Sequence, residues 1–211
     1  MLKLFADNRI KASWYMPSHT ILSFPGHMAK VRGTGYKIGL HGYIYEFVRF
    51  LKEQERNVMA KSIEVYQQFT GRYPKGWVAP DHPYYVADVP ADSNAATDYS
   101  KDPDTWMKPM TKHKPTKVVE IPGSWNVDAW RKPMNYTRRP GTHGFVNRRN
   151  IEVQWRDQFD FFYREYDSLV FCVSSHPQVS GKPNIMLMHE RFIKDLKSKE
   201  GVEFVTMVRE S

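Results

Sequence analysis

The stretch Tyr36-Lys-Ile-Gly-Leu-His-Gly-Tyr-Ile-Tyr-Glu46 passes from a short apolar run into a turn that carries one histidine. Residues 36–40 predict a strand. Residues 46–69 predict a long helix, because their apolar side chains recur at roughly helical spacing until Gly71 and Pro74 end the pattern. A strand followed by a helix is the repeating unit of parallel α/β folds.

The same order of strand and helix recurs along the chain. Further strands are expected at residues 10–16, 76–79, 118–121, 169–175 and 202–207. Further helices are expected near residues 1–8, at 24–32, from Asn147 or Asn150 to Tyr166, and from Pro183 to Gly201. The last two helices carry apolar stripes, made of Ile151, Trp155, Phe159, Phe162 and Tyr166 in one and of Ile185, Met188, Phe192 and Leu196 in the other. This alternation predicts an α/β protein with a parallel sheet or barrel.

The length and composition favour one folded domain over residues 1–211. The chain has 211 residues and is rich in aromatic side chains, with 6 Trp, 12 Tyr and 12 Phe. No apolar run reaches the roughly 18 residues that a membrane-spanning helix needs, so no membrane partner is expected. Cys172 is the single cysteine and lies in an apolar run, which predicts a core position and excludes an internal disulfide. The first residues lack the apolar stretch of a signal peptide, which predicts a cytoplasmic protein.

The positive charge is concentrated in the middle of the sequence. The formal net charge is +8, and residues 101–149 hold eleven Lys or Arg against four Asp or Glu. A basic patch of this kind can bind nucleic acid. No recognition helix, zinc finger or RNA-binding motif accompanies it, so we interpret the region as a solvated, proline-rich loop and expect no nucleic-acid partner.

Polar residues follow four of the expected strands. His19 follows the first, His41 the second, Asp81 and His82 the third, and His176 the strand at 169–175. The carboxyl ends of parallel strands meet at one edge of a sheet, and chemistry collects there. We therefore expect a functional cleft on that face, and we interpret histidines elsewhere, His189 among them, as structural or surface residues.

Four stretches together resemble one known family. They are Ile10-Lys-Ala-Ser-Trp-Tyr-Met-Pro-Ser-His-Thr20, Gly39-Leu-His-Gly-Tyr-Ile-Tyr-Glu46, Gly76-Trp-Val-Ala-Pro80 and Ser174-Ser-His-Pro-Gln-Val-Ser-Gly-Lys-Pro183. In this order they resemble the polysaccharide deacetylases, the carbohydrate esterases with NodB homology. Stretches such as Glu120-Ile-Pro-Gly-Ser-Trp125 and His143-Gly-Phe-Val-Asn147 resemble a bacterial and fungal subgroup, so the resemblance covers nearly the whole chain. It implies an α/β fold with a distorted (β/α) barrel.

The resemblance also implies a chemistry. In this family a divalent metal, held by one Asp and two His, assists hydrolysis of an acetamide on an N-acetylated polysaccharide. A second Asp acts as base, and a His after a late strand protonates the leaving amine. Some relatives resemble cyclic-amide hydrolases of the allantoinase or imidase kind, so a small amide substrate is an alternative. The family is often exported.

Several residues match family positions. His41 matches the first metal-binding histidine, and His176 matches the general acid. Trp125 and Asp128 match a Trp-x-x-Asp segment that lines the cleft, with a core aromatic and a turn residue as the alternative interpretation. Two further residues, Trp77 and His19, could contact substrate, although core packing is the commoner role of an aromatic side chain in a strand.

The sequence departs from the family pattern in three places. The Asp-containing strand would lie before Met1, an αβ unit is missing between Pro80 and Pro83, and Tyr45 stands where the second metal-binding histidine is expected. With one of three ligands left, zinc binding is expected to be weak or absent, because catalytic zinc normally has three protein ligands. The resemblance therefore implies an incomplete barrel with exposed apolar surface, which could form oligomers.

Three functions stay open at this point. The chain is an impaired polysaccharide deacetylase, a non-catalytic relative that binds carbohydrate or a protein partner, or a cyclic-amide hydrolase. In each case His41, Asp128 and His176 are the candidate site residues.

Overall fold

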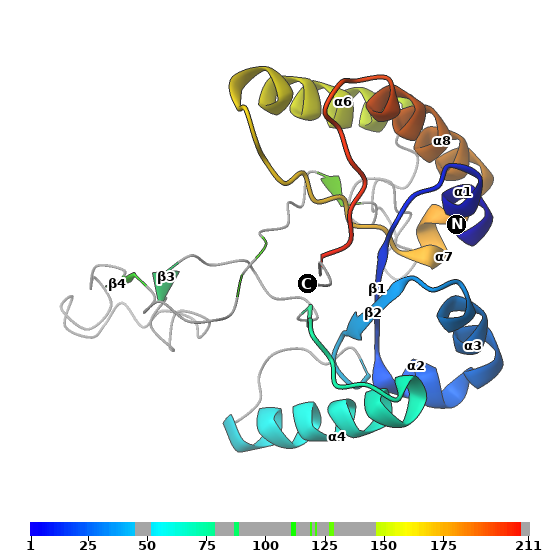
Figure 1. Cartoon of the computed structure of the whole chain (residues 1–211), viewed down its shortest axis with the longest axis vertical. Coiled ribbons are helices and arrows are strands. Elements are labelled where there is room, and N and C mark those ends of the chain that lie inside the picture. The colour runs from blue at the N-terminus through cyan, green and yellow to red at the C-terminus, as the bar shows by residue number, and fades with distance from the viewer. Residues whose placement is uncertain are drawn as a thin grey trace, which may run out of the picture. The chain divides into compact units, whose positions relative to one another are not determined.

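The computed structural model describes residues 1–44, 52–78, 87–88, 111–112, 119, 121, 127–128 and 147–207 (Figure 1). The chain divides into two units, Met1–His82 together with Gly123–Ser211, and Pro83–Pro122. In the second unit, β3 (Ala87–Asp88) and β4 (Thr111–Lys112) form a short antiparallel pair that the sequence did not lead us to expect.

The first unit alternates helices and strands, as expected. Its elements in chain order are α1 (Leu2–Asp7), β1 (Ser13–Met16), α2 (Ser18–Ser23), α3 (Pro25–Gly33), β2 (Lys37–Leu40), α4 (Lys52–Thr70), α6 (Arg148–Glu165), α7 (Pro177–Ser180) and α8 (Pro183–Lys197). The short helices α2 and α7 were not expected. Among the described residues, no helix combines the length and the apolar character that crossing a bilayer requires.

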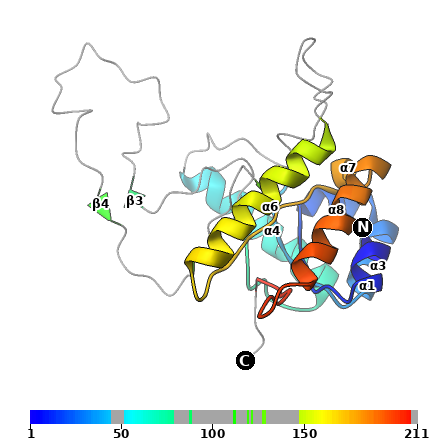
Figure 2. The ribbon, with the colours of Figure 1, turned by 90° about the horizontal axis from the view of Figure 1, so that it is seen from above.

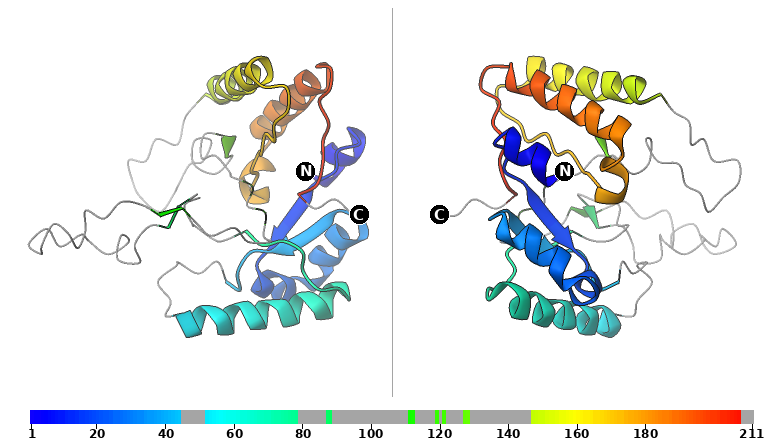
Figure 3. Two further views of the ribbon diagram at one scale, coloured as in Figure 1. Left: turned by 60° about the vertical axis from the view of Figure 1, so that its left-hand side comes forward. Right: turned by 90° about the vertical axis from the view of Figure 1, so that its right-hand side faces the viewer.

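The sheet of this unit has parallel strands. β1 and β2 pair from Ser13 with Lys37 to Met16 with Leu40, and the left view of Figure 3 shows the two blue strands next to each other. Leu40 also forms a parallel bridge to Trp77, where the Leu40 N–H donates to the Gly76 carbonyl at 3.1 Å. Three successive segments thus run in the same direction, which confirms the α/β class. A closed barrel is not among the features that the described residues show.

A first core packs three helices on this sheet. Met16 of β1, Ile21 of α2, Val31 of α3 and Val65 of α4 are all buried and in contact. Ser18 is also fully buried, and its hydroxyl donates to the Ser62 carbonyl on α4 at 3.3 Å. Apolar burial therefore holds the helices on the strands whose ends carry the candidate site.

A second core joins α6 to α8, which lie side by side in Figure 2. Trp155 is completely buried at its centre, and the stripe of α8 is buried against it as expected. Asn147 is the N-cap of α6, since its side-chain oxygen accepts from the Arg149 N–H at 3.0 Å. Of the two candidate caps, Asn147 is therefore the one used.

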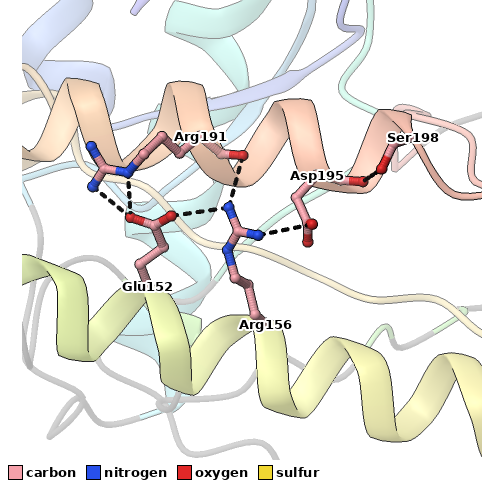
Figure 4. Close-up of polar contacts among 5 residues, drawn as sticks. All are labelled: Glu152, Arg156, Arg191, Asp195 and Ser198. Carbon is pink, nitrogen blue, oxygen red and sulfur yellow. Dashed lines mark hydrogen bonds and ion pairs between the residues drawn. The ribbon is translucent and has the colours of Figure 1, made fainter.

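A buried carboxylate clamps the same two helices (Figure 4). Glu152 of α6 is 6% exposed and accepts from Arg191 of α8 at 2.7 Å and from Arg156 at 3.0 Å. Arg156 also pairs with Asp195 at 2.8 Å and donates to the Arg191 carbonyl at 3.2 Å. Because each charge has an opposite partner, the network avoids the cost of an isolated buried ion.

The prediction of strands at residues 169–175 and 202–207 is wrong. Residues 169–175 have irregular backbone, with Val170 68% exposed, and only Ser174 forms a bridge, to Asp128. Residues 202–207 are irregular as well. An apolar run becomes a strand only where neighbours accept and donate its backbone hydrogen bonds, and apart from Asp128 the described residues supply no such ladder.

Three side chains that were expected in the core are exposed or only half-buried. Phe162 and Tyr166 continue the stripe of α6 but are 37% and 56% exposed. Cys172 is half-buried rather than part of the core. Of the expected strand at 118–121, only Val119 and Ile121 are described, and Val119 is 83% exposed.

We predict that Glu152→Gln lowers the free energy of unfolding by about 2 kcal/mol, because two arginines lose their shared buried carboxylate. Urea denaturation measures this change. The matched control is Glu165→Gln, whose ion pair with Arg164 is exposed and should contribute less than about 0.5 kcal/mol. Equal losses in the two variants would contradict the role of Glu152 as a clamp.

Candidate functional site

His41 lies directly after β2, as the sequence predicts. Its backbone N–H donates to the Met16 carbonyl at 3.2 Å, and its ring Nδ1 lies 2.8 Å from the Val78 carbonyl. A carbonyl oxygen only accepts, so Nδ1 is the protonated nitrogen and Nε2 carries the lone pair of the neutral ring. Metal-binding histidines commonly donate their second N–H to a carbonyl in this way, so His41 suits the role of a ligand.

Two glycines explain why the chain can place His41 there. A Cβ on Gly39 would lie 2.5 Å from the ring of Tyr15, its pairing partner on β1, so glycine leaves the space that this ring occupies. Gly42 has a φ of 69°, a left-handed conformation that glycine adopts without strain. The strand therefore ends in a sharp turn directly behind the histidine.

The described residues do not complete a metal centre around His41. No group of three His, Cys, Asp or Glu side chains that could hold a metal ion occurs within the described part of the chain. Tyr45, at the position expected for a second histidine, lies outside that part, as do Asp81 and His82. His41 alone suits a ligand, but the described donors do not fit a catalytic zinc ion, so no reaction step is assigned to a metal.

Asp128 and His176 form the second group of site residues. Asp128 pairs with Ser174 in a parallel bridge, supported by the Ser174 N–H, which donates to the Val127 carbonyl at 3.3 Å. His176 follows two residues later and its Nδ1 lies 3.5 Å from the Asp128 Oδ1. Both side chains are largely buried, at 22% and 11% exposure. The structure thus brings together two residues that are 48 positions apart in the sequence.

The beginning of α7 holds His176 in place. His176 is the N-cap of this helix, and its carbonyl accepts from the Val179 N–H at 2.9 Å and the Ser180 N–H at 2.8 Å. Val179 and Ser180 are both buried. The backbone of His176 is therefore anchored to the second core, while its ring faces Asp128.

Burial and charge act on this pair in opposite directions. Burial lowers the pKa of His176, and the neighbouring Asp128 carboxylate raises it. Burial, followed by Asp128, raises the pKa of the Cys172 thiol, so this cysteine stays protonated and unreactive near neutral pH. Cys172 was expected only in the core, and its place within the field of Asp128 could not be inferred from its apolar neighbours.

The remaining candidates differ in position. Trp77 is 43% exposed, so core packing, the commoner role of an aromatic side chain in a strand, does not describe it. His19 is exposed on α2, where a ring nitrogen lies 3.3 Å from the Ser23 hydroxyl and its backbone N–H donates to the Tyr43 carbonyl at 2.8 Å. Trp125 lies outside the described residues.

The fold and these residues define an α/β protein with histidines and an aspartate at the ends of parallel segments. No family model matches the sequence. A peptidoglycan deacetylase from Helicobacter pylori is 36% identical over 234 residues, which cover 98% of this chain and 79% of that protein. A peptidoglycan deacetylase-like protein, FGM2, from Gibberella zeae is 29% identical over 232 residues, which cover 93% of this chain and 68% of that protein. The chain therefore belongs to the polysaccharide deacetylase family, as its motifs indicate.

Solved structures support the same fold. A Mycobacterium smegmatis protein assigned to the polysaccharide deacetylases has a TM-score of 0.73 at 20% identity, with 98% of this chain and 72% of that chain covered. The allantoinase Puue has a TM-score of 0.70 at 20% identity, with 98% and 68% covered. BA3943 of Bacillus anthracis, a CE4 family pseudoenzyme, has a TM-score of 0.57 at 11% identity, with 98% and 57% covered. One mutant of BA3943 is described as having restored enzymatic activity.

We predict that Asp128→Asn lowers the pKa of His176 further, because the variant removes the carboxylate that raises it and leaves the burial that lowers it. An NMR titration of the His176 ring protons measures the change. Asp7→Asn, at an exposed residue paired with Lys3, is the control and should have no effect. An unchanged His176 pKa in Asp128→Asn would exclude the electrostatic coupling.

Proposed function

We propose that this protein is an amide hydrolase of the polysaccharide deacetylase type, which removes acetyl groups from an N-acetylated polysaccharide, and that turnover by this chain is impaired. The observation that carries the proposal is the Asp128–His176 pair, with 3.5 Å between Nδ1 and Oδ1. Both residues stand where the family motifs place the cleft aspartate and the general acid. Family membership supports a carbohydrate substrate.

The pair has a definite part in such a reaction. Water adds to the amide carbonyl, the C–N bond breaks, and the amine must take a proton to leave. The imidazolium form of His176 would donate that proton from Nε2, since Nδ1 faces Asp128. The carboxylate stabilises the charged ring and fixes its orientation, so Asp128 acts as a positioning residue. A His176 whose pKa lies below its usual value is a stronger acid toward the leaving amine.

The impairment is proposed from Tyr45. A phenol with a pKa near 10 is a poor ligand at neutral pH compared with the imidazole expected there. A gap within the chain supports the same interpretation, because the match to the Helicobacter pylori protein extends over 234 residues whereas the chain has 211. We propose that this gap includes the αβ unit expected near Pro80.

A non-catalytic, carbohydrate-binding role is the second candidate, and the exposure of Trp77 favours it. An indole that is 43% exposed beside the end of β2 offers an apolar face to a sugar ring. A role of this kind requires no complete metal site. It predicts that binding survives where turnover does not.

We predict that Tyr45→His increases bound zinc and raises acetate release from chito-oligosaccharide, because it supplies a second of the three protein ligands that catalytic zinc normally has. Acetate assays and elemental analysis measure the two changes. Tyr43→His, two residues away, is the matched control. His176→Ala should then abolish the activity gained by Tyr45→His. If Tyr45→His changes neither zinc content nor turnover, the impairment has another cause, and if turnover survives His176→Ala, the proposed acid is wrong.

We predict for the second candidate that the unaltered chain binds chito-oligosaccharide and that Trp77→Ala weakens binding about tenfold, through loss of a stacking face. Calorimetric titration measures the affinity. Tyr73→Ala, at a comparably exposed aromatic residue on the chain before Trp77, is the control and should bind as the unaltered chain does. An equal loss in both variants would remove Trp77 from the binding surface.

A further inference from the structure

His189 is a buried histidine that the site does not use. It lies on α8, is 4% exposed, and its ring centroid is 5.7 Å from that of Trp155 on α6. Its Nε2 and the Trp155 Nε1 are buried atoms that have no hydrogen-bond partner among the described residues. The neutral ring is tolerated in this position, whereas a protonated ring would place an uncompensated charge in the core.

The charged groups around His189 do not compensate such a charge. On α6, Glu152 is occupied by Arg156 and Arg191, and on α8, Asp195 is paired with Arg156. Glu190 precedes Arg191 on α8, and α7 contributes the uncharged and buried Ser180. The ammonium group of Met1, before α1, opposes protonation of His189. A proton on His189 would therefore meet the Met1 ammonium group, while the buried Glu152 carboxylate is occupied by Arg156 and Arg191.

The core around His189 also anchors the candidate site. Val179 of α7 packs in the same cluster as Trp155 and Met188, and α7 contacts α8. The first turn of α7 is bonded to the His176 carbonyl. If α6 and α8 lost their packing, α7, which has only four residues, would lose its contacts with this core. His176, which directly precedes α7, would then lose its anchor.

We propose that His189 makes this protein sensitive to acid: when its ring takes a proton, α7 and α8 loosen from α6, and His176 loses its alignment with Asp128. The device is reversible, because neutralising the ring restores an apolar contact with Trp155. It does not depend on which reaction the site performs or on whether the site is active.

The direction of the pH dependence follows from burial. Burial, and after it the Met1 ammonium, lowers the pKa of His189 from 6.5 to about 4. In the loosened state the ring regains its ordinary pKa and binds a proton more readily than in the packed state. The stabilisation is complete above pH 6.5 and is lost as the pH falls from 6.5 toward 4. Across that window the equilibrium shifts toward the loosened state by about two orders of magnitude.

An acid titration from pH 8 to pH 4, followed by near-UV circular dichroism, tests the proposal on the full chain. The unaltered protein should lose its aromatic signal within this range. His189→Leu should retain the signal to a pH at least about one unit lower, because no ring is left to protonate. His189→Gln, polar but not titratable, is the second variant if His189→Leu does not fold. His27→Leu removes an exposed histidine of α3 and should behave as the unaltered protein.

The backbone amide NMR signals of Val179 and Ser180, which donate to the His176 carbonyl, test the connection to the site in the same titration. Unlike the His176 ring, these amides do not titrate, so in the unaltered protein they should change together with the aromatic signal, and in His189→Leu they should follow the later transition. Identical midpoints in the unaltered protein and both His189 variants would overturn the proposal. A shifted midpoint without a matching change in these amide signals would overturn the link through α7.

Discussion

The packing of α6 against α8 around Trp155 is the interaction on which the rest of this region depends. Trp155 is completely buried, and the helices are joined further by Glu152 between two arginines. α7 rests on this core through Val179, and the chain reaches His176 directly before α7. Among the described residues, Ser174 alone of residues 169–175 forms a bridge, to Asp128, so the helical core rather than a ladder of strands positions the histidine.

The two site histidines follow the same rule of placement but differ in their surroundings. His41 ends a paired strand and is oriented by a backbone carbonyl, which suits a ring that binds through its other nitrogen. His176 ends an irregular segment and is oriented by a carboxylate, which suits a ring that gains and loses a proton. Proton transfer by His176 needs only its pairing with Asp128. Metal binding by His41 needs further ligands, which the described residues do not supply.

Family membership and the condition of this site therefore lead to different conclusions. The first establishes descent from polysaccharide deacetylases, with a sequence 36% identical to a peptidoglycan deacetylase. The second depends on single residues such as Tyr45, at the position where the family motif leads us to expect a histidine, and it does not follow from family membership. The family contains pseudoenzymes of the same fold, such as BA3943. Fold and chemistry must accordingly be tested separately in this chain.

The sequence by itself determined the helices with strong apolar periodicity, the two asparagines that could cap α6, the segments that become β1 and β2, and the positions of His41 and His176 at the ends of segments. These features depend on local spacing, so they can be recognised without the fold. Only the tertiary structure decided which asparagine caps α6, that residues 169–175 and 202–207 are not strands, and that Phe162 and Tyr166 are exposed. It also decided that Asp128 faces His176 and that the buried His189 Nε2 has no hydrogen-bond partner within the described part of the chain. The physical reason is that strand pairing, burial and proton affinity depend on neighbours that are distant in the chain.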